Sequence, residues 1–217
     1  MKRFLDVVVG SMLFVLALPI TVAALIVSII FLRSNPFFVQ ARVGYMGRRF
    51  KLVKIRTLPV RTPVYADKYQ LKMHRLPRPL RMIRKAHLDE LPQLVHVVIG
   101  RMSLVGPRPE MPNLHASFDP AFAELRTSVR PGCFGLWQVS PERHRLIGEA
   151  PAYDAFYVNH RTIRLDLWTV WQGVIVSLQL RDGVSITDIP GRLVSHRRIS
   201  GSKTDTLLEV APARARA

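Results

Sequence analysis

Two adjacent acids and an arginine framed by prolines are the residues whose types and spacing best suit phosphate chemistry. The acids are Asp89 and Glu90, and the arginine is Arg108, which stands between Pro107 and Pro109. One carboxylate can attack phosphorus as a nucleophile, and the other can take Mg²⁺, which prefers few carboxylates together with phosphate oxygens and water. The prolines fix backbone angles on both sides of Arg108, so its guanidinium has a rigid mount suited to phosphate. We therefore expect a phosphate-bearing substrate.

The charge of the chain also indicates an anionic partner. The formal net charge is +17, from 32 Lys and Arg against 15 Asp and Glu. Residues 42–108 hold sixteen basic residues but three acids, Asp67, Asp89 and Glu90. Such surroundings are expected to keep the carboxylates ionised and to attract phosphate. The chain has no helix-turn-helix, zinc-finger or aromatic RNA-binding signature, so we expect no nucleic acid as partner.

The N-terminal region is expected to enter a membrane. Residues 7–32 form 26 positions without a charge, enough for a helix that crosses the hydrocarbon layer. A cleaved signal is disfavoured, because its apolar run is usually shorter and ends in small residues. Pro19 bends a helix at its middle, so the segment can enter and leave on one face, although a plain span stays open on the residues alone. Lys2, Arg3 and Arg33 favour cytoplasmic ends.

A hairpin and an irregular connection are expected after this segment. Residues 37–39 and 50–55 have strand composition, and the glycine-bounded segment 44–47 is typical of a turn between them. Residues 59–79 include four prolines among polar and basic residues, which indicates an irregular connection. Residues 191–217 are rich in Arg, Ser, Lys and Ala and are expected to form a poorly ordered basic tail.

A helix is expected to carry the two acids in its first turn. Its apolar residues recur at three- and four-residue spacing, at Leu88, Leu91, Leu94, Val95 and Val98. Pro92 fits a first turn, where backbone N–H groups lack helical partners. A second apolar run, residues 167–180, is too short to span a bilayer. We expect a core helix there, with a helix at the membrane surface through Trp168 and Trp171 as the alternative.

Five sequence blocks carry a family resemblance. The stretch 88–110, LDELPQLVHVVIGRMSLVGPRPE, resembles the signature of the bacterial sugar transferases, the monotopic polyprenyl-phosphate phosphoglycosyl transferases. The other four blocks lie at residues 40–44, 50–57, 130–139 and 153–167, and all five stand in the same order as in the family. A single Asp-Glu pair would carry little weight, but ordered blocks across residues 1 to about 180 are hard to obtain by chance.

The resemblance implies an architecture and a reaction. The fold would be α+β, a mostly helical small catalytic domain with a short β-hairpin at residues 35–190, attached to a re-entrant helix-break-helix membrane segment at residues 1–34. The reaction would transfer a hexose 1-phosphate from a UDP-sugar to undecaprenyl phosphate and release UMP, which initiates exopolysaccharide or glycan synthesis. The catalytic domain would lie on the cytoplasmic face of the inner membrane, in contact with membrane lipids.

The resemblance also implies residue roles. Asp89 would be the nucleophile that forms a covalent aspartyl-phosphosugar intermediate, Glu90 would bind Mg²⁺, and Pro19 would mark the membrane break. The candidate contacts to nucleotide or lipid phosphate are Lys54, Arg56, Arg84, Pro107, Arg108, Pro109, Arg130, Gln138 and Arg143. The residues do not identify the sugar, and they leave a homo-oligomer open.

The chain departs from the family pattern at several positions. His96 stands where Asn is common and Arg101 where Asp is common, and residues 141–145 replace a frequent Gly-Arg. This last departure leaves open whether Arg143 or Arg145 contacts phosphate. It also keeps a catalytically degenerate scaffold in consideration, and the net charge of +17 keeps a membrane-tethered basic binding protein in consideration.

Overall fold

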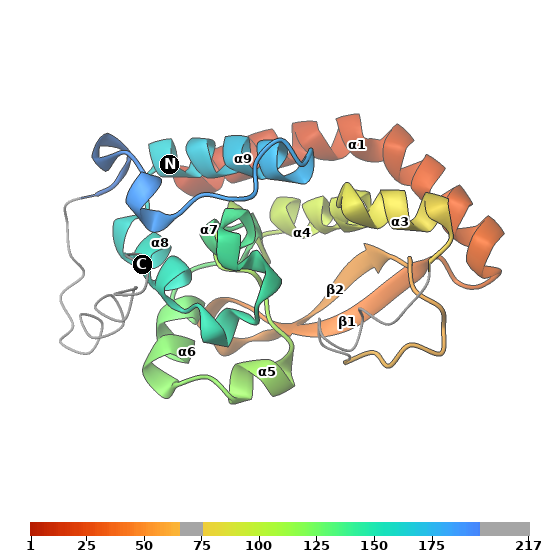
Figure 1. The fold of residues 1–217 in the computed structure, drawn as a ribbon, viewed down its shortest axis with the longest axis horizontal. Coiled ribbons are helices and arrows are strands. Elements are labelled where there is room, and N and C mark those ends of the chain that lie inside the picture. The colour runs from red at the N-terminus through yellow and green to blue at the C-terminus, as the bar shows by residue number, and fades with distance from the viewer. Residues whose placement is uncertain (66–75, 196–217) are drawn as a thin grey trace.

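The computed structural model describes residues 1–65 and 76–195 of the chain (Figure 1). In these residues the fold is mostly helical, with one long apolar N-terminal helix and two small two-stranded sheets. The expected α+β class is confirmed. Most of the expected basic tail, residues 191–217, lies outside the described residues, and so does the centre of the connection at residues 59–79.

Helix α1, Lys2–Leu32, is continuous through Pro19. Figure 1 shows this helix bent, running along one side of the molecule and turning toward the hairpin at its C-terminal end. A proline inside a helix removes one backbone hydrogen bond and clashes with the preceding turn, so a bend is its usual effect. The break that we predicted between two helices is therefore a bend within one helix.

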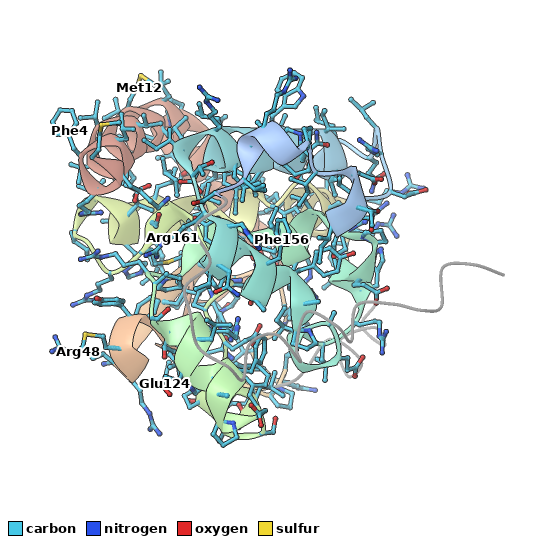
Figure 2. The ribbon with its side chains drawn as sticks, turned by 90° about the vertical axis from the view of Figure 1, so that its left-hand side faces the viewer. Phe4, Met12, Arg48, Glu124, Phe156 and Arg161 are labelled. Atoms are coloured by element: carbon cyan, nitrogen blue, oxygen red, sulfur yellow. The ribbon has the colours of Figure 1, made fainter. Side chains whose placement is uncertain are left out.

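The polarity of α1 is the reverse of that of a helix on a water-exposed protein surface. The positions that face the protein are small or polar: Asp6, Gly10, Ala17, Ala24 and Ser28. The outward positions are large and apolar, among them Phe4, Val8, Met12, Val15, Val22, Ile26 and Ile30. Figure 2 shows Phe4 and Met12 pointing away from the rest of the protein. A water-facing helix would have the opposite arrangement, so the outer face of α1 suits contact with hydrocarbon.

Both ends of α1 are attached to the same body. Near the N-terminus, the Asp6 carboxylate accepts hydrogen bonds from the Ser103 hydroxyl at 2.8 Å and the Leu104 N–H at 3.1 Å. Near the C-terminus, the Ser28 hydroxyl donates to the Arg56 carbonyl at 2.7 Å. Because these contacts lie 22 residues apart on α1, the helix lies along the domain rather than projecting from it.

The predicted hairpin is present. Strands β1, Phe37–Val43, and β2, Arg49–Ile55, pair antiparallel and are joined through a 3₁₀ turn at Tyr45–Gly47. Strand β1 is longer than the predicted 37–39. On β2, Leu52 and Ile55 are buried in separate apolar clusters, and Lys54 lies between them.

The second sheet is parallel and was not predicted. Strand β3, Ser103–Val105, pairs with β4, Gly132–Phe134, and the chain between them includes helices α5, Pro112–Ala116, and α6, Pro120–Thr127. The backbones approach closely where the strands end: a Cβ on Gly132 would lie 2.1 Å from the Gly106 nitrogen. This sheet fixes the start of the Arg108 loop relative to α7, Leu136–Val139.

The acids lie on a different kind of helix from the one expected. Helix α3, Arg78–Lys85, is followed by a 3₁₀ helix η2, Leu88–Gln93, and then by the short α-helix α4, Leu94–Val98. His87 precedes η2 with a left-handed φ of 55°, and Pro92 supplies no N–H inside it. One continuous α-helix over residues 88–98 was therefore a wrong prediction, and the connection predicted at 59–79 ends where α3 begins.

The C-terminal half supplies most of the core. After the 3₁₀ turns η3, Pro141–His144, and η4, Ile147–Glu149, come α8, Ala152–His160, and α9, Ile163–Ser177. Two further 3₁₀ turns, η5 at Ile186–Asp188 and η6 at Gly191–Leu193, follow α9. The largest buried cluster joins β3, α7, α8 and α9 through residues such as Val105, Leu136, Tyr157 and Leu165.

Helix α9 contributes to the core and also to the apolar surface. Leu165, Thr169 and Val176 are buried, whereas Trp171 is 62% exposed. Its other exposed apolar residues are Leu167, Val174 and, just beyond the helix, Leu178. Figures 1 and 2 place α9 on the same side of the molecule as α1, and Lys2 forms an ion pair with Asp166 of α9 at 2.5 Å. The expected core helix is confirmed for one face, with Trp168 also packed against the core cluster, whereas a position of the exposed face at a membrane surface stays a prediction.

The close approach of β3 and β4 generates a stability prediction. Gly132→Ala should lower the free energy of unfolding by about 2 kcal/mol or more, because its methyl group would overlap the backbone of Gly106. Gly191→Ala is the matched control, since no atom lies within 4 Å of its added Cβ, and should change that free energy by less than about 0.5 kcal/mol. Chemical unfolding in detergent would measure both. Equal stability of the two variants would contradict the contact.

Candidate active site

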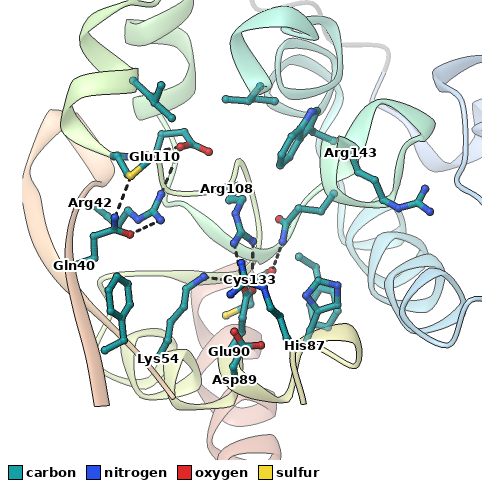
Figure 3. Close-up of a pocket in the computed structure, with 18 of the residues that line it drawn as sticks. Gln40, Arg42, Lys54, His87, Asp89, Glu90, Arg108, Glu110, Cys133 and Arg143 are labelled. Atoms are coloured by element: carbon teal, nitrogen blue, oxygen red, sulfur yellow. Dashed lines mark hydrogen bonds and ion pairs between the residues drawn. The ribbon is translucent and has the colours of Figure 1, made fainter. Parts of the chain in front are cut away.

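A cavity of about 1010 Å³ joins the two acids to the apolar helices (Figure 3). Its polar wall comes from β1, β2, η2 and the Arg108 loop. Its apolar wall includes Leu13, Leu16 and Ile20 of α1, and Gly173 and Val176 of α9. The lining thus changes from charged to apolar toward the side where both helices expose large apolar residues.

Glu90 is held between two cations at the polar end. Lys54 donates to Glu90 Oε1 at 2.7 Å, and Arg108 donates to Oε1 at 2.7 Å and to Oε2 at 3.3 Å. Burial alone would raise the pKa of Glu90, but the charges of Arg108 and Lys54 outweigh it and hold that pKa well below its usual range. Glu90 is therefore ionised, as its basic surroundings predicted.

Asp89 behaves differently from its neighbour. Its side chain is 6% exposed, and in the described part of the chain its Oδ1 has no hydrogen-bond partner. Burial, followed by the charge of Glu90, raises the pKa of Asp89 to about 6. The basic surroundings lower this pKa less than burial raises it, because desolvation outweighs the attraction of Lys54 and Arg84, so Asp89 takes the expected ionised form only above about pH 6. Above pH 6 the site holds a poorly solvated carboxylate, which suits a nucleophile.

The acids fit a magnesium ion that substrate phosphate would complete. No group of three or more His, Cys, Asp or Glu side chains gathers for a metal within residues 1–65 and 76–195. Mg²⁺ is commonly held by one or two carboxylates plus substrate phosphates and waters, so two acids are sufficient. Asp89 Oδ1 carries no protein partner there, and Glu90 Oε2 accepts one hydrogen bond and retains a lone pair, whereas Oε1 accepts two. The predicted role of Glu90 as metal ligand stays a prediction.

Two more of the predicted basic residues line this cavity. Arg56 is held at the end of the hairpin by carbonyls of Asn35, at 2.9 Å, and Phe37, at 3.3 Å. Arg84 of α3 donates to the Thr57 hydroxyl at 3.4 Å. With Lys54 and Arg108, they make four cations in the lining of the cavity that holds the acids.

Of the remaining candidates, some lie in the cavity and some do not. Gln138 lines it and donates to the Cys133 carbonyl at 3.0 Å. Arg143 also lines it, with hydrogen bonds to the carbonyls of Ser140 and Asp182, whereas Arg145 is an exposed partner of Glu142 and Glu149. Arg143 is therefore the better placed of the two arginines.

Arg130 and the two prolines lie outside the cavity. The Arg130 guanidinium donates to the Gly100 carbonyl at 3.0 Å and lies 5.2 Å from the Tyr45 ring centroid, so it does not join the other cations. Pro107 and Pro109 shape the loop behind Arg108. Pro19 is not part of the lining, although its neighbours Ala17 and Ile20 are.

A group of buried polar residues behind the Arg108 loop was not predicted from the sequence. Gln40, Arg42 and Glu110 line the cavity in a hydrogen-bonded set, with Arg42 donating to Glu110 at 3.4 Å (Figure 3). Arg126 and Asp154 form a second buried pair at 2.8 Å. Four of these residues fall within or beside the matched blocks, but Arg126 stands in no motif. Their role depends on contacts far apart in sequence.

The unequal pKa values of the acids can be measured directly. In carboxyl-labelled protein followed by ¹³C NMR, Asp89 should titrate with a midpoint of about 6. Glu90→Gln should lower that midpoint, because it removes a neighbouring negative charge and releases Lys54 to act on Asp89. Glu124→Gln, an exposed change on α6, should leave it where it was. A midpoint that stays the same or rises in Glu90→Gln would contradict the assigned coupling.

The family model and the individual relatives found by comparison with known proteins agree with one another. The model of the bacterial sugar transferase family matches residues 1–180. The chain is 32% identical to a Caulobacter vibrioides UDP-glucose:undecaprenyl-phosphate glucose-1-phosphate transferase, over 86% of this chain and 70% of that protein. It is 30% identical to the exopolysaccharide production protein ExoY of Rhizobium meliloti, over 80% of this chain and 83% of that one.

Other relatives are much longer than this chain. A UDP-galactose-lipid carrier transferase of Erwinia amylovora is 32% identical over 81% of this chain, but the match spans 38% of its own length. For an uncharacterized sugar transferase of Haemophilus influenzae, the matched share of that protein is 39%. The family match nevertheless covers most of the chain and includes the acids, the Arg108 loop and α1. The chain belongs to the bacterial sugar transferase family.

Proposed function

We propose that this protein transfers a hexose 1-phosphate from a UDP-sugar to undecaprenyl phosphate, releases UMP, and so initiates exopolysaccharide or glycan synthesis. The observation that carries the proposal is the buried Asp89 carboxylate, with an unpartnered oxygen in the described structure, beside the Glu90–Lys54–Arg108 cluster. The activities for which these relatives are named support the same substrate classes. Neither alternative function gives a reason for a raised Asp89 pKa beside a lowered Glu90 pKa in one cavity.

In the first step, a carboxylate oxygen of Asp89 attacks the phosphorus that carries the sugar. A P–O bond to Asp89 forms while the bond from that phosphorus to the bridging oxygen of UMP breaks, and the electron pair leaves with UMP. Lys54 and Arg108 are preorganised beside the acids, where they stabilise charge that develops on the phosphate oxygens. The raised pKa still leaves Asp89 ionised at neutral pH, so no base is needed.

In the second step, an oxygen of the lipid phosphate attacks the same phosphorus. The P–O bond to Asp89 breaks, the electron pair returns to the carboxylate, and a sugar diphosphate lipid is released. Mg²⁺, for which Glu90 is the proposed ligand, would neutralise negative charge on the diphosphate when bound. Arg56, Arg84 and Arg143 line the remaining polar wall and are the proposed contacts to nucleotide or lipid phosphate.

The packing of α1 supports a re-entrant position in the membrane. A helix that crossed the bilayer would carry Asp6 and Ser28 to opposite sides, yet both residues are bonded to one domain. Helix α3 packs on α1 and contains Arg78, Arg81, Arg84 and Lys85. If α1 crossed the bilayer, these charged residues would be drawn into hydrocarbon, which is unfavourable. We infer that α1 dips into one leaflet with both ends on the cytoplasmic face of the inner membrane, where basic flanks favour them.

The apolar end of the cavity then faces the lipid. The outward faces of α1 and α9 both expose large apolar residues, with Trp171 suited to the interface between hydrocarbon and headgroups. A lipid phosphate can approach the acids from this side while its chain stays among Leu13, Leu16, Ile20 and Val176. The UDP-sugar would enter from the polar side.

The catalytic proposal predicts the effect of Asp89→Asn. Purified protein in detergent or nanodiscs with undecaprenyl phosphate should release UMP from at least one member of a UDP-sugar panel. Asp89→Asn should reduce the rate by about 10³-fold or more, because the amide is not a nucleophile for phosphorus. Mass spectrometry of wild-type protein quenched without lipid acceptor should find the sugar phosphate on Asp89. Equal turnover by Asp89→Asn, or an adduct on another residue, would overturn the role.

The membrane proposal predicts accessibility at the two ends of α1. In a Cys133→Ser background, a cysteine placed before Lys2 and, separately, Arg33→Cys should both resist an impermeant maleimide in intact cells. Both should react after lysis, which also controls for reactivity. Labelling of either position in intact cells would show a spanning helix.

A further inference from the structure

The loop that carries Arg108 is held mainly through its carbonyl groups. Pro107 and Pro109 have no N–H, so the loop cannot be fixed by the donors of a normal strand. Carbonyl groups at the start of the loop instead accept hydrogen bonds from other elements. The Val105 carbonyl accepts from the Tyr157 hydroxyl at 2.9 Å, and the Pro107 carbonyl accepts from the Gly132 N–H at 2.9 Å. The local chain therefore depends on donors brought from other elements.

Two buried arginines hold the next two carbonyls. Arg126 of α6 donates to the carbonyl of Arg108 at 2.7 Å, and Arg42 of β1 donates to the carbonyl of Pro109 at 3.1 Å. Each arginine also has a carboxylate partner: Asp154 for Arg126 at 2.8 Å and Glu110 for Arg42 at 3.4 Å. The backbone that carries the Arg108 side chain is thus hydrogen-bonded by two separate elements, α6 and β1.

The Arg126–Asp154 pair is unusually well placed for this task. The side chains are 4% and 1% exposed, and the guanidinium lies 5.1 Å and 5.6 Å from the ring centroids of Phe118 and Phe122. A buried ion pair adds little net stability, because the desolvation of both charges offsets their attraction. Its benefit here is geometric, since two nitrogens of one rigid fork reach Asp154 and the Arg108 carbonyl at once.

We propose that Arg126, aligned by Asp154, is a positioning residue for the transfer reaction: it sets the backbone of Arg108 so that its guanidinium meets the Glu90 cluster. The inference rests on the proposed function, because it assigns Arg126 an effect on the phosphoryl transfer that Arg108 stabilises. Arg42, with Glu110, fixes the following peptide from the β1 side. Arg126 is absent from the lining of the catalytic cavity, so it acts through Arg108 and not on substrate.

Arg126→Lys is the sharpest test of this role. Lysine keeps the charge beside Asp154, but its single nitrogen cannot occupy the positions of both Arg126 nitrogens. A loss of alignment by a fraction of an ångström to 1 Å should lower kcat for UMP release by about 10–100-fold, with KM changed by less than about threefold. Arg181→Lys, an exposed arginine beside Asp188, is the matched control and should keep both constants.

A double-mutant cycle separates positioning from general stability. Arg108→Ala removes the guanidinium but keeps the carbonyl that Arg126 holds. In that background Arg126→Lys should change the single-turnover rate by less than about twofold, because nothing remains to be aligned. A merely structural role would lower the rate equally in both backgrounds. Asp154→Asn, measured in the same cycle, should show the same pattern and replaces Arg126→Lys if the latter does not fold.

The outcomes are distinct. No UMP release by wild-type protein would overturn the proposed function itself. Release by the wild type, with kcat unchanged in a folded Arg126→Lys or Asp154→Asn variant, would overturn the positioning role alone, and so would equal losses with and without Arg108. A loss of rate that occurs when Arg108 is present, and not in the Arg108→Ala background, would support the positioning role.

Discussion

The arrangement of the site depends on one partly buried carboxylate shared by two cations. Glu90 draws Lys54 from the hairpin and Arg108 from the loop after β3, so three segments distant in sequence meet at its two oxygens. Its negative charge also acts on the adjacent Asp89, whose pKa rises to about 6 through burial and this neighbour. Without Glu90, two partly buried cations would lose their shared carboxylate partner, which is unfavourable.

The surrounding fold can be understood as support for that contact. The parallel sheet β3–β4 fixes where the loop begins, and the Gly106–Gly132 approach leaves no room for a side chain. The two prolines of the loop have no N–H groups to donate, so the loop is held by donors from elsewhere: buried arginines donate to its carbonyl groups. Helix α1 closes the other side, with Ala17 of its inward face in the cavity wall.

Local features of the sequence predicted a good part of this. The acid pair, the proline-framed arginine and the hairpin are each encoded within a few residues, and the structure brings Lys54, Arg84 and Arg108 to the acids as expected. Counting charges did not reveal the raised pKa of Asp89, because a sequence does not show burial. Arg126 and Asp154 lie 28 residues apart and meet through packing, so no spacing rule could pair them. The parallel sheet was missed because its strands are three residues long.

In the proposed membrane position, the double attachment of α1 sets a fixed height of the acids above the hydrocarbon. Transfer of each methylene of a prenyl chain into water would cost about 0.8 kcal/mol, so lifting a long chain to a distant active site would be prohibitive. A domain bonded to its anchor near both Asp6 and Ser28 cannot drift outward on a tether. Under the proposed function, the reaction is thereby confined to a plane, where the acceptor arrives by lateral diffusion and its encounter rate follows its surface density rather than its bulk concentration.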